Sequence, residues 1–98
     1  MPSRYEPCGL NQIYSLRYGT VPVVRATGGL DDTIEEGTGF KFAEHTGAAL
    51  WAAIQAATEA FADPDAWRGM MRRAMAKDFS WKVSAAAYSA LYRRLLGA

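Results

Sequence analysis

The sequence predicts an α/β fold in which short parallel strands are followed by a tail of three helices. Residues 1–42 are rich in glycine, threonine and β-branched residues, whereas residues 43–98 are rich in alanine. A compact β-branched run at 21–25 lies between turn-forming residues, which is typical of a buried parallel strand. Aromatic and aliphatic residues then recur at helical spacing. We therefore divide the chain into an α/β region at 1–42 and a helical tail at 43–98.

Local signals predict the elements of the α/β region. The first apolar positions follow helical spacing, and Gly19 stands where a left-handed C-terminal cap is preferred. Helix, buried strand, glycine loop and strand together make half of an α/β unit. The predicted order is a helix over 9–18, a strand over 21–25, a flexible loop at Thr27-Gly28-Gly29, and a strand over 40–42.

Three helices are predicted in the tail. Asp63 is a favoured N-cap residue for the second of them, and Pro64 follows at the first helical position. Ser80 is expected to cap the third helix. The predicted apolar faces comprise Leu50, Ile54, Ala57 and Phe61 in the first helix, Trp67, Met70, Met71 and Ala74 in the second, and Tyr88, Leu91 and Leu95 in the third.

Length, charge and cysteine content exclude several classes of protein. A chain of 98 residues forms one small domain at most. Its net charge of +1, without a clustered basic face, argues against a nucleic-acid partner. One cysteine excludes an internal disulfide and fits a reducing compartment. No long apolar run or signal sequence is present, so we expect a cytoplasmic protein without a membrane partner.

The stretch EPCGLNQIYSLRYG, residues 6–19, places an acid, a cysteine and a glycine directly ahead of the first predicted helix. A helix N-terminus attracts anions, and Gly9 leaves its N–H groups open to a ligand. Asn11 adds an amide that can donate to a phosphate oxygen, while Glu6 can accept hydrogen bonds from sugar hydroxyls. This combination suits a sugar nucleotide. The alternative is that Glu6 only favours the helix dipole and that Gly9 only makes a tight turn.

Three stretches carry a resemblance to a known family, namely PSRYEPCGLNQIYSLRYGTVPVVRATGGLDDTI (2–34), GTGFKF (37–42) and DFSW (78–81). They resemble segments of bacterial glycogen synthases and plant starch synthases. The resemblance implies the GT-B architecture, with the active site in the cleft between two Rossmann-like domains. It also implies transfer of glucose from ADP-glucose, with retention, to the non-reducing end of an α-1,4-glucan, without a cofactor. The chain would be a partial, C-terminal donor-binding domain of such an enzyme.

The resemblance also implies a set of site residues. Glu6 would contact the transferred glucose and stabilise the charge that develops on it. Tyr14 stands where related transferases often carry a second acid, so no ribose-binding carboxylate is expected there. The backbone N–H groups of residues 8–10 would hold sugar hydroxyls and the distal phosphate. The implied donor-binding residues are Cys8, Gly9, Leu10, Asn11, Tyr14, Thr27, Gly28 and Gly29.

The other chemically notable residues are interpreted as structural. Cys8 could have an activated thiol at a helix N-terminus, but the sequence places no histidine beside it, which favours packing or a ligand-facing thiol. His45 is expected to be solvated. The acidic residues form an expected solvated edge rather than a metal site, and they are Asp31, Asp32, Glu35 and Glu36.

The family resemblance implies that Met1 is an internal methionine, and we expect the chain to be a fragment that is inactive alone. Two alternatives stay open, a C-terminal piece of another sugar-nucleotide glycosyltransferase and a free-standing helical interaction module without catalysis. Because two strands cannot cover all the predicted apolar faces, we also expect the isolated chain to self-associate.

Overall fold

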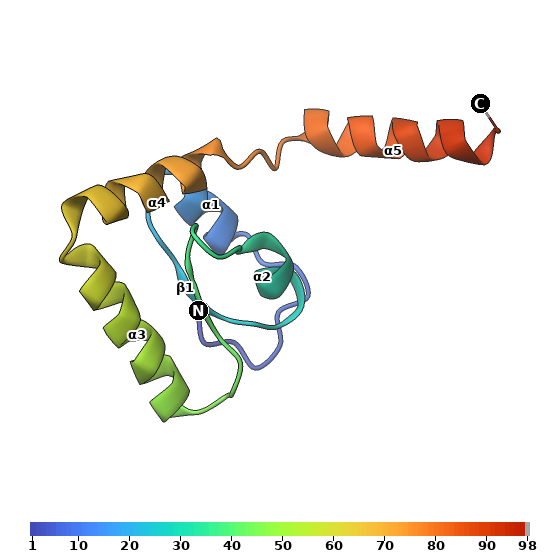
Figure 1. Cartoon of the computed structure of the whole chain (residues 1–98). Coiled ribbons are helices and arrows are strands. Elements are labelled where there is room, and N and C mark those ends of the chain that lie inside the picture. Colours follow the sequence, from blue (N-terminus) through green and yellow to red (C-terminus); the bar gives the residue numbers. More distant parts are fainter. Residues whose placement is uncertain (98) are drawn as a thin grey trace.

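The computed structural model describes residues 1–97 and has the predicted α/β order, with one additional short helix at 28–33 where the sequence predicts a loop. Its two strands pair in parallel, with Val23 opposite Phe40, Val24 opposite Lys41 and Arg25 opposite Phe42. The prediction of short parallel strands followed by three helices is confirmed (Figure 1). The elements are α1 (Asn11–Arg17), β1 (Val23–Arg25), α2 (Gly28–Thr33), β2 (Phe40–Phe42), α3 (Gly47–Phe61), α4 (Pro64–Ala76) and α5 (Trp81–Leu95).

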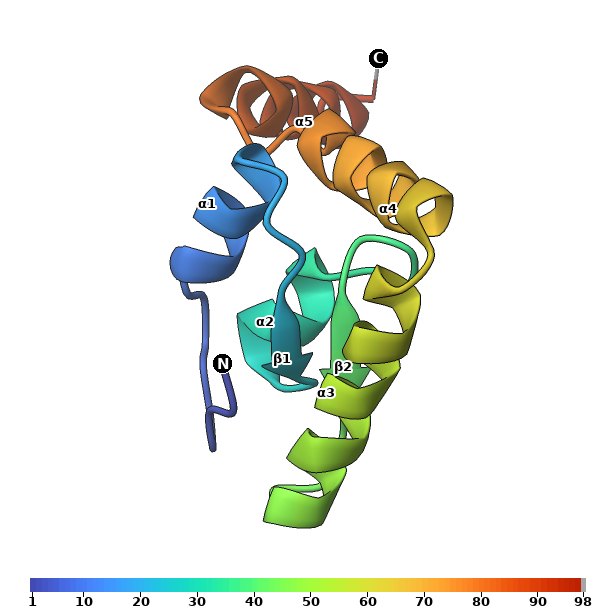
Figure 2. The ribbon, with the colours of Figure 1, turned by 90° about the vertical axis from the view of Figure 1, so that its left-hand side faces the viewer.

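The helices surround the strand pair. In Figure 1, α3 covers one side of the strands and α2 lies on the other. Figure 2 shows α4 running across the end of this arrangement, where it contacts both α1 and α3. The buried core lies where these elements meet, and it comprises Leu16, Val24, Leu30, Ile34 and Ala74. Each large apolar side chain in this core contributes about 1.5–3 kcal/mol by leaving water.

The N-terminal residues lie along the free edge of β1. The amine of Met1 donates to the carbonyl of Val23 at 2.7 Å, and the N–H of Arg25 donates to the carbonyl of Met1 at 3.0 Å. These two bonds have the slanted pattern of a parallel ladder. The Arg25 guanidinium also donates to the carbonyls of Ser3 and Arg4, at 3.3 and 2.6 Å. Residues 1–4 are therefore fastened to β1, which sets the path of the chain into residues 5–10.

The predicted apolar face of α3 is wrong in part. Ala53 is buried and Leu50 is half-buried against the strands, whereas Ile54 is 38% and Phe61 is 65% exposed. Alanine lets the helix approach the sheet closely, and a sheet of two short strands covers only a narrow stripe. Phe61 instead packs edge-on against Trp67 of α4, with ring centroids 5.2 Å apart.

The N-terminus of α4 has the cap and the proline that the sequence predicts. The Asp63 carboxylate accepts hydrogen bonds from the N–H groups of Asp65 and Ala66, both at 3.2 Å, and Pro64 occupies the first helical position. Met70 and Ala74 are buried, as their helical spacing predicts. The cap and the apolar face together place α4 against α1.

The last helix, α5, projects away from the rest of the chain (Figure 1). Every residue of α5 is described, and none is buried. Ser80 stands at its N-cap as predicted, but its side chain makes no capping bond. The Asp78 carboxylate accepts from the Ser80 N–H at 2.8 Å instead, and hydrogen bonding to Ser80 lowers the pKa of Asp78. Among residues 1–97, no helix combines the length and the apolar character that crossing a membrane requires.

Candidate functional site

Gly9 turns the chain into α1 with a backbone that an L-residue rarely adopts. Its φ is +71°, and a β-carbon placed there would come within 2.7 Å of Gln12 Oε1 and 3.2 Å of Glu6 Cγ. Glycine is therefore required here both by conformation and by space. The helix begins at Asn11, two residues later than predicted, so residues 8–10 precede it as a turn in which Cys8 and Leu10 are exposed and Gly9 is half-buried.

Gly28 and Gly29 pack directly against the backbone of this turn. The predicted flexible loop is wrong, because Thr27 is the N-cap of α2 and the two glycines form its first turn. The Gly29 N–H donates to the Glu6 carbonyl at 2.9 Å, and a β-carbon on Gly28 or Gly29 would overlap the backbone of Glu6 or Cys8. The glycines thus allow two backbones to lie in direct contact.

Gln12 lies at the centre of this contact, and the sequence interpretation missed it. Its side chain is fully buried. Its Nε2 donates to the carbonyls of Cys8 and Gly9 at 2.8 and 3.2 Å, and to Thr33 Oγ1 at 3.2 Å. A glutamine in a first helical turn can reach back to the carbonyls three and four residues earlier, which is the signal that could have revealed it.

The other predicted site residues differ in exposure. Glu6 is half-buried, whereas Leu10 and Asn11 are exposed. Cys8 is an exposed free thiol. The structure therefore brings residues 6–11 together at one surface. Among residues 1–97, no three His, Cys, Asp or Glu side chains gather in a way that could hold a metal ion.

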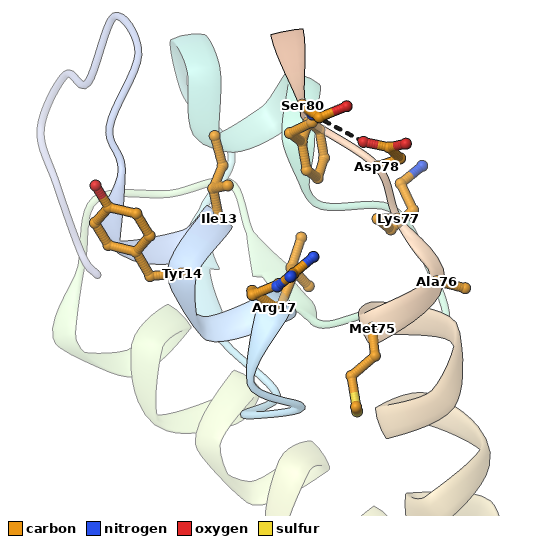
Figure 3. A pocket seen from close by; sticks show the side chains of 10 residues that line it. Ile13, Tyr14, Arg17, Met75, Ala76, Lys77, Asp78 and Ser80 are labelled. Atoms are coloured by element: carbon orange, nitrogen blue, oxygen red, sulfur yellow. Dashed lines mark hydrogen bonds between the residues drawn. The ribbon is translucent and has the colours of Figure 1, made fainter. Parts of the chain in front are cut away.

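Tyr14 lies one turn further along α1, beside a cavity of about 520 Å³. Figure 3 shows Tyr14 and Arg17 on the α1 side of this cavity, with Lys77 and Asp78 on the opposite side. Lys77 also pairs with Glu35, with Nζ and Oε1 2.7 Å apart. None of the residues that line this cavity belongs to the segment 6–11, so Tyr14 faces a different surface hollow from that segment.

The chain is closely similar to bacterial glycogen synthases. It is 61% identical to a glycogen synthase of Anaeromyxobacter sp. over 97% of this chain, and 58% identical to that of Koribacter versatilis over 96%. The glycogen synthase 2 of Geobacter sulfurreducens is 52% identical over 95% of the chain. The chain spans only about 21% of the length of these relatives. No family model matches it.

Two solved structures share the fold. The catalytic domain of starch synthase IV from Arabidopsis thaliana, bound to ADP and acarbose, superposes with a TM-score of 0.82 and 34% identity, over 99% of this chain and 22% of that one. The sucrose-phosphate synthase of Thermosynechococcus elongatus gives 0.65 and 36%, over 98% and 24%. By sequence and by fold, the chain matches a segment that makes up about one fifth of the length of glycogen and starch synthases, which are GT-B glycosyltransferases.

Proposed function

We propose that this chain is part of the donor-binding domain of a retaining glycosyltransferase, which transfers glucose from ADP-glucose to the non-reducing end of an α-1,4-glucan in the cytoplasm. The observation that carries the proposal is the 61% identity to a glycogen synthase across 97% of the chain. The structural neighbour with ADP and acarbose bound supports a nucleotide and a glucan-like sugar as ligands of the whole enzyme.

The turn at residues 6–11 is the proposed donor contact. Glu6 stabilises the positive charge that develops on the transferred glucose. Among the described residues, the N–H groups of Gly9 and Leu10 donate no hydrogen bond within the chain, so they are open to sugar hydroxyls and phosphate oxygens. The exposed amide of Asn11 adds a donor for phosphate. Cys8 supplies the backbone of the same turn.

The remaining site residues have supporting roles in this proposal. Tyr14 is exposed on α1 and faces a different hollow from the turn, so it would contact the donor only beyond the phosphates, at the nucleoside end. Thr27, Gly28 and Gly29 act by holding the backbone of Glu6 and Cys8, since Gly29 is buried beneath that backbone. A direct contact between this glycine pair and the donor is not needed.

A chimera tests the proposal. Residues 1–98 replace the matching segment of the Anaeromyxobacter glycogen synthase, and transfer of labelled glucose from ADP-glucose to glycogen is measured. We expect the chimera to be active and the isolated chain to give no transfer above a no-protein control, because a GT-B cleft needs both domains. Transfer by the isolated chain, or a folded chimera that transfers glucose only from other sugar nucleotides, would contradict the proposal. The second outcome would favour the alternative of a different sugar-nucleotide glycosyltransferase.

The exposure of α5 supports the predicted self-association of the isolated chain. Tyr88 and Leu95 are 61% and 73% exposed, and Leu91 is 43% exposed on the same face. Exposed contiguous apolar surface drives association. We expect light scattering to show a dimer or larger species at micromolar concentration, and the double substitution Leu91→Glu and Leu95→Glu to reduce it. Ser89→Glu is the control on another face of α5. A monomer at every concentration would refute self-association.

A further inference from the structure

Gln12 is an unusual side chain to bury. Glutamine is mostly exposed in folded proteins, yet Gln12 has no exposed surface. Burying an amide is unfavourable unless hydrogen bonds replace its contacts with water. An apolar side chain of the same length would occupy the same space without this penalty. The hydrogen bonds of the Gln12 amide must therefore offset the cost of burying it.

Those contacts determine where two peptide groups point. In a trans peptide, the C=O and the N–H point in opposite directions. Gln12 Nε2 lies 2.8 Å from the Cys8 carbonyl oxygen and 3.2 Å from that of Gly9. The N–H groups of the same two peptides, which belong to Gly9 and Leu10, must then point away from Gln12. Neither donates a hydrogen bond within the described residues.

A continuous set of hydrogen bonds links Gln12 to Glu6. Nε2 donates to Thr33 Oγ1 at 3.2 Å, and Thr33 Oγ1 donates to the Gly29 carbonyl at 2.6 Å. The Gly29 N–H donates in turn to the Glu6 carbonyl at 2.9 Å. Gln12 therefore fixes the turn directly at the carbonyls of Cys8 and Gly9. It also fixes the Glu6 carbonyl indirectly, through Thr33 and Gly29 of α2.

The orientation of the Gln12 amide is set by these acceptors. Among the described residues, Oε1 is buried and has no hydrogen-bond partner. Turning the amide over would give Oε1 a place beside the carbonyl oxygens of Cys8 and Gly9, where acceptor would face acceptor. The side chain thus leaves one acceptor unpaired next to Gly9, while its nitrogen donates to the two carbonyls.

We infer that Gln12 is a positioning residue for donor binding: its amide nitrogen holds the carbonyls of Cys8 and Gly9, so that the N–H groups of Gly9 and Leu10 face the sugar nucleotide. This inference rests on the proposed function. Gln12 makes no predicted contact with the sugar nucleotide. It determines whether the N–H groups of Gly9 and Leu10 point toward that ligand.

The test compares Gln12→Met with Gln55→Met in the chimera. Methionine has a similar length and no amide, and Gln55 is exposed on α3. Without the Gln12 amide, the N–H groups of Gly9 and Leu10 should lose their contacts with the donor. This loss should raise the KM for ADP-glucose roughly tenfold or more. The KM for glycogen should stay unchanged, as should both constants of Gln55→Met. A merely structural role would reduce the amount of folded enzyme, and hence the apparent kcat, while the donor KM stayed at the unsubstituted value.

Thr33 provides a second pair of variants in case Gln12→Met folds poorly. Thr33→Ser keeps the hydroxyl that links Gln12 to Gly29, whereas Thr33→Val keeps the shape and removes it. We expect the donor KM to rise in Thr33→Val and to be restored in Thr33→Ser. An unchanged donor KM in both Gln12→Met and Thr33→Val would overturn the inference.

Binding of ADP, measured by calorimetry on the same chimeras, separates this inference from the proposed function. If the unsubstituted chimera is folded but transfers no glucose, the proposed function fails. Weaker ADP binding by Gln12→Met than by Gln55→Met would still support the positioning role. Equal ADP affinity of these two variants would overturn it.

Discussion

Glu6→Ala is expected to lower the turnover of the chimera by roughly 100- to 1000-fold, the effect of losing one preorganised group at a developing charge. The carboxylate is proposed to act where the transferred glucose becomes positively charged, so its loss should affect the transition state far more than the bound donor. Turnover at saturating ADP-glucose and the affinity for ADP are the two measurements. We expect the affinity to change much less than the turnover.

Glu59→Ala is the matched control for this substitution. Glu59 is an exposed acid on α3, in a helix that contributes no residue to the turn at 6–11. It should leave both turnover and ADP affinity at the unsubstituted values. Turnover of Glu6→Ala close to that of Glu59→Ala would remove Glu6 from the catalytic role.

Gly29→Ala is expected to lower the free energy of unfolding of the isolated chain by roughly 3 kcal/mol, the upper range for forcing extra volume into a packed interior. A β-carbon at Gly29 would overlap the backbone of Cys8, and a backbone cannot move aside as a flexible side chain can. The same displacement would break the bond from the Gly29 N–H to the Glu6 carbonyl. Urea unfolding followed by circular dichroism measures the change.

Gly47→Ala is the control for the glycine substitution. Gly47 is the first residue of α3, and a β-carbon there would have no atom within 4 Å. Alanine at such a position typically stabilises a protein by about 0.4–1 kcal/mol, because it restricts the unfolded chain. The two substitutions should therefore have opposite signs. A destabilisation of similar size in both would show that the contact between α2 and the turn contributes little.

The sequence predicts a chemistry for the candidate site, which stays a prediction, but it does not predict the side chain that supports the site. The residue types of Glu6, Gly9 and Asn11, together with the family resemblance, pointed to a sugar nucleotide at this turn, and the structure brings residues 6–11 to one surface. Gln12 carries no such signal, because a glutamine in a helical pattern is ordinarily an exposed residue. The Gly28-Gly29 pair was misread for a similar reason. A glycine pair ordinarily signals a flexible turn, whereas here it permits close approach of two backbones.

The sequence by itself determined the order of the elements other than α2, and it determined the start of α4. These depend on neighbours in the chain, such as Asp63 accepting from Asp65 and Ala66 only two and three residues away. The tertiary structure alone decided which face of α3 is buried. It also decided that Gly29 lies under Cys8, and that Gln12 joins the turn to α2. Each of these depends on which surface arrives from a distant part of the chain, as when Gln12 meets Thr33 across 21 residues. Local periodicity carries no information about that partner, since the same residue pattern is compatible with several packing arrangements.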